Sequence, residues 1–156
     1  MRVGHGFDVH AFDDHRRLVL GGVTIPDAPG LAGHSDADVV SHAVADALLG
    51  AASLGDLGTH FPPDERWRDT SSIELLRETA ALLSKAGFRI VNIDVTVIAE
   101  RPRLATHRGA MTATIADALS VHENLLSIKA TTADGLGFTG RGEGIAATAV
   151  ALIEET

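Results

Sequence analysis

Cysteine and tyrosine are absent from this chain, and aromatic residues make up only 4% of it, with a single tryptophan. Without cysteine there is no disulfide and no thiolate metal ligand, so a bound metal would have to rest on His, Asp or Glu. Hydrophobic residues still make up 45% of the chain, which is ordinary for a globular protein. Because aromatic rings are scarce, we expect a core built from Ala, Val, Leu and Ile.

Basic residues are in the minority, since 13 Lys and Arg stand against 21 Asp and Glu, a formal net charge of −8. This balance argues against a nucleic-acid-binding surface, which needs a basic patch. No stretch approaches the roughly 18 apolar residues of a membrane span. The first residues, MRVGHGFDVH, also lack the basic and apolar parts of a signal peptide. We therefore expect a cytoplasmic protein whose partners include neither nucleic acid nor membrane.

The chain shows strand and helix patterns but no linker, repeat or low-complexity tract. Its 156 residues suit one domain, which we take as residues 1–156. Strands are predicted at 1–10, 18–20, 23–25, 88–99 and 126–131, most clearly at 88–99, which is rich in β-branched residues. Apolar spacing and end signals predict helices at 36–52, at 105–119, and from a Ser71 capping box to Gly87. Residues 145–153 fit a strand or a helix, and we favour a strand. This order predicts an α/β sandwich, with helices on one face of a mixed sheet.

Turns and helix ends follow from Gly, Pro and capping residues. Gly21-Gly22 would join the strands on either side of it as a hairpin. Residues 26–33, with two prolines and two glycines, and the polar residues 53–69 are predicted loops. Ser35 is the expected N-cap of the helix at 36–52.

Asp8 and His10 lie two residues apart at the end of the first strand, so their side chains emerge on one face. That arrangement suits two ligands of one ion, although an exposed Asp and His beside a loop would give the same pattern. His42 borders the apolar stripe of the helix at 36–52 and has Asp38 and Asp46 one turn to either side. It is therefore either a third ligand or a core histidine satisfied by Asp38 or Asp46. Together, Asp8, His10 and His42 would leave one coordination position open, as in catalytic zinc sites.

A glycine-rich segment at 130–144 offers a second site. Its glycines let backbone amides approach an anion closely, and Thr131, Thr132 and Arg141 add donors suited to phosphate. No P-loop or dinucleotide-binding spacing is present. A plain turn between strands, with Arg141 paired to Glu143, fits the segment equally well. Asp56, between Gly55 and Gly58, suits a carboxylate that binds substrate hydroxyls, or else a simple helix end.

Three separated motifs resemble the family of 2-C-methyl-D-erythritol 2,4-cyclodiphosphate synthases: GHGFDVHAF, HSDADVVSHAVADALLGAASLGDLGTHFP and KATTADGLGFTGRGEGIAA. The resemblance spans the whole chain. It implies a homotrimer with active sites at subunit interfaces. The implied reaction converts a CDP-linked methylerythritol 2-phosphate into a cyclic diphosphate and CMP.

The resemblance also implies roles for individual residues. Zinc or manganese would bind Asp8, His10 and His42, and magnesium or manganese would bind at the substrate diphosphate. His34 and Thr132 fall on positions that stabilise the transition state. Further substrate contacts fall on Val9, Ser35, Asp56, Leu57, Gly58, Phe61, Asp64, Ala99, Pro102, Arg103, Leu104, Ala105, Ala130, Thr131, Phe138 and Arg141.

The chain departs from the family pattern at two points. Pro63 follows Phe61-Pro62 where an Asp is usual, so either Asp64 or Glu65 replaces that Asp. Asp134 stands where many relatives carry a Glu ligand for the second ion, and its reach is one methylene shorter. Two other classes remain open from the residues alone: a zinc hydrolase that releases a linear phosphate, and a non-catalytic trimeric binding module with a structural metal.

Overall fold

Five strands form one sheet in the order β2-β1-β5-β3-β4 in the computed structural model, which describes residues 1–156. β3 and β4 run parallel, and every other neighbouring pair is antiparallel. The predicted mixed sheet is therefore confirmed. Its strands are β1 (Arg2–Leu20), β2 (Val23–Leu31), β3 (Phe88–Ile98), β4 (Leu126–Thr131) and β5 (Gly144–Glu155).

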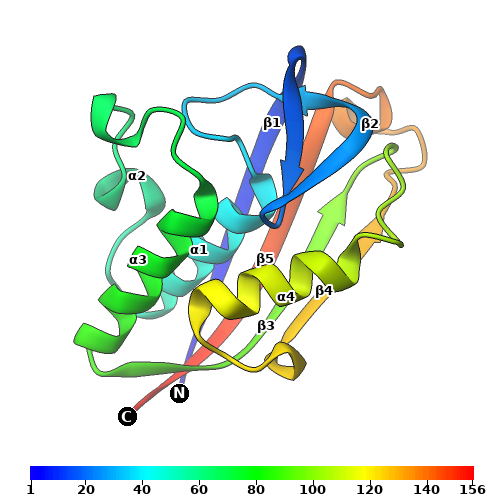
Figure 1. The fold of residues 1–156 in the computed structure, drawn as a ribbon. Coiled ribbons are helices and arrows are strands. Elements are labelled where there is room, and N and C mark those ends of the chain that lie inside the picture. The colour runs from blue at the N-terminus through cyan, green and yellow to red at the C-terminus, as the bar shows by residue number, and fades with distance from the viewer.

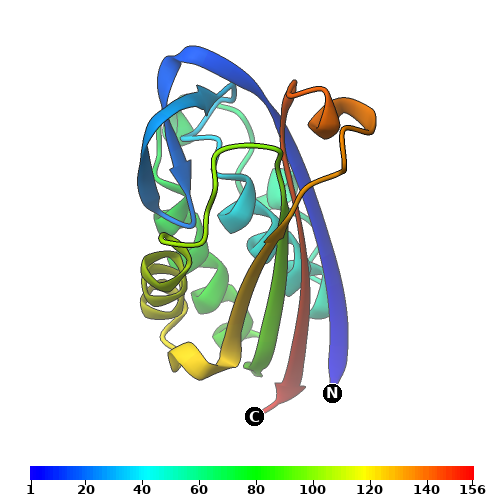
Figure 2. The same cartoon turned by 90° about the vertical axis from the view of Figure 1, so that its right-hand side faces the viewer.

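The three long helices cover one face of this sheet and leave the other face bare (Figures 1 and 2). They are α1 (Val39–Ala51), α3 (Ser72–Lys85) and α4 (Arg108–Leu119). Two four-residue helices, α2 (Leu57–His60) and α5 (Gly137–Gly140), lie in segments predicted as loops. None of the helices combines the length and apolar character that crossing a membrane requires.

Helix α1 packs directly on β1 and β5. A Cβ added at Gly4 would lie 1.9 Å from the carbonyl oxygen of Ala47, and one added at Gly6 would lie 2.0 Å from that of Ala43. Only glycine permits this approach. Even-numbered residues of β1 face the helix and odd-numbered ones face away, so the same alternation carries Asp8 and His10 toward α1.

The predicted elements agree with the structure in kind. The strand at 145–153 and the helix between Ser71 and Gly87 are confirmed, and Ser71 is the N-cap of α3. Gly21 and Gly22 form the predicted hairpin turn with positive φ angles of 56° and 75°. The loop predicted at 26–33 is wrong, because β2 continues to Leu31 and pairs with β1.

The predicted N-cap at Ser35 is also wrong, since α1 begins after Asp38. The fully buried Asp38 carboxylate accepts hydrogen bonds from the Val40 and Ser41 amides and from Ser41 Oγ. It also accepts from the amides of Gly21 and Gly22, both at 2.8 Å. Asp38 therefore ties the start of α1 to the β1–β2 turn.

The bare face of the sheet carries apolar side chains that the chain itself does not cover. Val3, Phe7 and Val9 of β1 are 69%, 52% and 39% exposed, and Val150 of β5 is 44% exposed. The β1–β5 register pairs Val150 with His5, so all four side chains lie on this face.

Candidate metal centre and adjoining cavities

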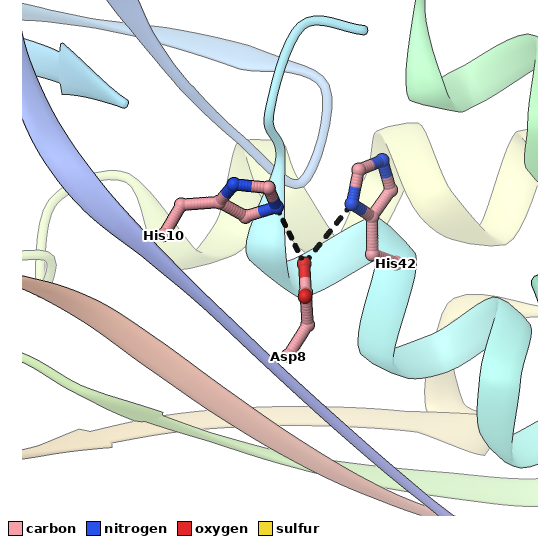
Figure 3. Close-up of side chains that lie close together, drawn as sticks. All are labelled: Asp8, His10 and His42. Atoms are coloured by element: carbon pink, nitrogen blue, oxygen red, sulfur yellow. Dashed lines mark hydrogen bonds and ion pairs between the residues drawn. The ribbon is translucent and has the colours of Figure 1, made fainter. Parts of the chain in front are cut away.

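The structure brings together the three residues that the sequence proposed as ligands. Asp8 and His10 project from β1 toward α1, and His42 projects from α1 to meet them (Figure 3). One carboxylate oxygen, Asp8 Oδ2, lies 3.0 Å from His10 Nε2 and 3.0 Å from His42 Nδ1. The possible ligand atoms all lie within 4.8 Å of one another. Val9, between the first two, points to the bare face of the sheet.

The charges at this cluster favour an ionised Asp8. Burial opposes the negative charge, but hydrogen bonds and electrostatic attraction from His10 and His42 outweigh it and lower the pKa of Asp8 to about 2. Burial likewise opposes a charge on His10, yet the Asp8 carboxylate and the Ala32 carbonyl raise the pKa of that ring. The carboxylate thus attracts positive charge into the space between the rings.

The hydrogen bond behind His10 shows how the ring would serve a metal. His10 Nδ1 lies 2.5 Å from the carbonyl oxygen of Ala32. A carbonyl only accepts, so Nδ1 carries a proton, and when the ring is neutral its Nε2 lone pair faces Asp8. A lone pair facing a carboxylate at 3.0 Å is satisfied by a cation between them. The cluster therefore fits a divalent metal with two imidazole ligands and one carboxylate.

His42 is not held by the residues that its helix spacing suggested. Asp38 caps the helix, and Asp46 Oδ1 accepts from the amide of Leu57 at 3.0 Å. The interpretation of His42 as a core histidine satisfied by either aspartate is therefore wrong. His42 Nε2 instead meets Ser72 Oγ at 2.8 Å and Ser35 Oγ at 3.2 Å. Ser72 was not predicted as part of the site, because its position in the sequence indicates only the start of a helix.

A cavity of about 220 Å³ opens beside the cluster. The sequence had singled out His34, Ser35, Leu57 and Phe61 of its lining, and it missed Trp67 and Leu75. His34 Nε2 donates to the backbone carbonyl oxygen of Asp64 at 2.7 Å. This hydrogen bond holds the orientation of the His34 ring. The Asp64 side chain itself caps the turn at Glu65–Trp67, while Glu65 pairs with Arg68.

A second cavity, of about 410 Å³, lies between the segment that follows β3 and the end of β4. Eight of the predicted substrate-binding and catalytic residues line it, and it shares no lining residue with the first cavity. Two charged residues in its lining, Glu100 and Arg108, were missed. The predicted residues that line it are Ala99, Pro102, Arg103, Leu104, Ala105, Ala130, Thr131 and Thr132.

Glu100 shapes the loop that follows β4. Its Oε1 accepts from the Ala133 amide at 2.9 Å and from the Gly135 amide at 3.4 Å. Between these amides Asp134 takes a positive φ of 52°, and its Oδ1 accepts from Thr132 Oγ1 at 3.2 Å. Asp134 therefore lies beside Thr132, which lines the second cavity.

Seven predicted residues line neither cavity within the chain: Val9, Asp56, Gly58, Asp64, Asp134, Phe138 and Arg141. Asp56 is exposed, caps α2 and accepts from Thr59, which lowers its pKa, and Gly58 follows in the same helix. Phe138 is 42% exposed on α5, and Arg141 pairs with Glu143 at 3.0 Å. Within a single chain, Arg141 is therefore paired with Glu143, as the plain-turn interpretation of this segment predicts.

Fold and cluster together define a mixed-sheet α/β protein with a two-histidine, one-carboxylate group that could hold a metal ion. The sequence profile of the YgbB family matches residues 1–154, and the chain belongs to this family. It is 56% identical over 156 residues to the 2-C-methyl-D-erythritol 2,4-cyclodiphosphate synthase of Syntrophomonas wolfei, covering 99% of each chain. It is 58% identical over 154 residues to that of Moorella thermoacetica, covering 98% of this chain and 94% of the relative. The family resemblance is therefore confirmed.

Solved structures agree with this assignment. The bifunctional IspDF of Campylobacter jejuni superposes with a TM-score of 0.95 at 40% identity, over 99% of this chain and 42% of that one. The CDP complex of IspF from Plasmodium falciparum gives a TM-score of 0.86 at 32% identity, over 99% of this chain and 96% of the other. The single α/β fold is thus shared across distant relatives.

If His42 binds metal, His42→Ala should lower zinc bound per chain and reduce activity by more than about 100-fold, because two ligands hold zinc poorly. Zinc would be measured on the purified protein by atomic absorption, with circular dichroism to check the fold. His15→Ala is the matched control, since His15 is exposed and outside the cluster. Parent-like zinc content in His42→Ala would remove His42 from the ligand set.

Proposed function

We propose that the protein is a metal-dependent cyclodiphosphate synthase, a phosphorus–oxygen lyase of isoprenoid precursor biosynthesis. It would convert 4-diphosphocytidyl-2-C-methyl-D-erythritol 2-phosphate into 2-C-methyl-D-erythritol 2,4-cyclodiphosphate and release CMP. The observation that carries the proposal is the Asp8–His10–His42 cluster, found in a chain 56% identical to a curated synthase over its whole length.

The proposed reaction needs no nucleophile from the protein. An oxygen of the substrate's 2-phosphate attacks the β-phosphorus, the bond from that phosphorus to the bridging oxygen breaks, and CMP leaves with the oxygen. The main task of the protein is to hold the two phosphates in contact. Divalent cations, zinc or manganese at the cluster and magnesium or manganese at the diphosphate, would offset the negative charge of the reacting groups. His34 and Thr132 would add hydrogen bonds to the transferring phosphate.

The second cavity is the proposed cytidine site. Its wall combines small apolar side chains with the backbone at 130–132, and Arg103 and Arg108 supply positive charge beside it. An apolar wall suits a base, and guanidinium groups suit phosphate. The Plasmodium falciparum relative, solved as a CDP complex, supports a cytidine nucleotide as the ligand class.

We also propose that the active protein is a homotrimer whose sites lie between subunits. One substrate must reach both a metal and a nucleotide pocket, and within one chain those cavities share no lining residue. A neighbouring subunit could supply the missing half. The exposed Val3, Phe7 and Val150 on the bare sheet face are the kind of surface that an obligate interface covers. Asp56, Gly58, Phe138 and Arg141 would complete the site there.

Product analysis tests the reaction. With the CDP-linked substrate, zinc and magnesium, mass spectrometry should find the cyclic diphosphate and CMP in equal amounts. A zinc hydrolase would instead release a linear phosphate, heavier than the cyclic product by one water. Linear product alone would reject the cyclase.

Asp134 is proposed to hold the second cation, directly or through a water. Asp134→Ala should then slow turnover by about 100-fold, since charge on the diphosphate is left uncovered, while zinc at the cluster stays bound. Asp134→Glu should retain activity, because it restores the commoner ligand. Magnesium would be titrated at saturating zinc for both variants and the parent. The parent's rate and magnesium dependence in Asp134→Ala would leave Asp134 as a turn residue only.

The trimer is tested by sedimentation, which should give a molecular mass three times that of the 16.3 kDa chain. Phe7→Asp places a charge on the bare sheet face, and it should dissociate the trimer and abolish turnover because each site then lacks its second half. Asp14→Asn, at an exposed position of β1, is the control for a change of charge. A monomer with full activity would contradict shared sites.

A further inference from the structure

A buried chain of hydrogen bonds runs from His42 away from the metal cluster. His42 Nε2 lies 2.8 Å from Ser72 Oγ, and Ser72 Oγ in turn donates to Asp36 Oδ1. The other oxygen of Asp36 accepts from the Ser72 amide at 2.8 Å. Ser72 is fully buried and His42 is 7% exposed. Solvent therefore does not compete for the His42–Ser72 contact, while Asp36 at the far end of the chain is partly buried.

The donors and acceptors in this chain fix where the His42 proton sits. A carboxylate only accepts, and a serine hydroxyl has one hydrogen to give. Because that hydrogen points to Asp36, Ser72 Oγ must accept from His42, so Nε2 carries the ring proton. Ser35 Oγ, 3.2 Å away, can act as a second, weaker acceptor. The neutral ring then presents its Nδ1 lone pair to Asp8 Oδ2 at 3.0 Å.

We propose that Ser72 and Asp36 are positioning residues for the metal centre: they hold His42 in the Nε2–H tautomer and aim Nδ1 at the cation. The inference deepens the proposed function and rests on it. It also makes the two histidines equivalent in kind, since the Ala32 carbonyl does for His10 what Ser72 does for His42. Such partners of ligating histidines typically affect metal affinity 10- to 100-fold.

Asp36 and Ser72 also join the start of α3 to the segment before α1, so a purely structural role must be separated from positioning. Ser71 provides the matched control. It caps the same helix end through the Ile73 amide at 3.3 Å, it is exposed, and it has no contact with His42. Ser71→Ala should weaken α3 and leave zinc binding alone.

The experiment measures zinc affinity of the full chain by competition with a chelating dye at fixed pH. Ser72→Ala and Asp36→Asn should raise the zinc dissociation constant about 10- to 100-fold, whereas Ser71→Ala should leave it within twofold of the parent. Ser72→Thr keeps the hydroxyl and should restore affinity. Asp36→Asn keeps the size of the side chain, so it tests the hydrogen-bond chain from His42 to Asp36 even if Ser72→Ala fails to fold.

A second readout follows the proton directly. Nitrogen-15 NMR of the metal-free protein, at a pH where the rings are neutral, should show the Nε2–H tautomer of His42 in the parent and a mixture of tautomers in Ser72→Ala. Parent-like affinity and tautomer in Ser72→Ala and Asp36→Asn would overturn the positioning role, as would equal losses in Ser71→Ala. A parent that binds neither zinc nor manganese would instead reject the proposed metal-dependent function, and the NMR comparison would still decide the tautomer.

Discussion

Helix α1 lies with its backbone against β1, because Gly4 and Gly6 place no side chain between them and Ala43 and Ala47 add little bulk on the helix. A β-carbon at either glycine would force the two elements apart. This close contact sets the distance between Asp8 and His10 in the middle of β1 and His42 near the start of the helix. The cluster depends on that distance, since a three-ligand metal site tolerates errors of only a few tenths of an ångström.

Around this contact the polar groups are supported in layers. Asp8 faces both histidines, and each ring is held from behind by an acceptor, the Ala32 carbonyl or the Ser72 hydroxyl. No buried side-chain nitrogen or oxygen lacks a hydrogen-bond partner. Such a network is rigid because moving one member leaves another unpaired in a poorly solvated place. The three side chains are therefore already oriented without a cation, which would lower the cost of binding one.

Local pattern was enough to predict the strands β3, β4 and β5, the hairpin at Gly21-Gly22 and the pairing of Asp8 with His10 on one face, because alternation and turn chemistry act over a few residues. It did not predict that β1 is continuous to Leu20 or that β2 continues to Leu31. It could not choose the N-cap of α1 within His34–Asp38, where several residues are suitable caps. Asp38 is selected by the Gly21 and Gly22 amides, which are distant in sequence. Ser72 was missed for the same reason, since its contact with His42 spans 30 residues.

The net negative charge of the protein limits how it could hold the proposed substrate, which carries several phosphates. A chain of net charge −8 has little general attraction for a polyanion. Positive charge must then be concentrated where phosphates bind, and Arg103 and Arg108 provide it at one cavity. The other cavity is lined by Asp8 and histidines with no Lys or Arg, so a bound cation is the available source of charge there. The cation would bind the enzyme through the same ligands whose orientation the fold fixes, and the acidic surface would leave phosphates few competing places to bind.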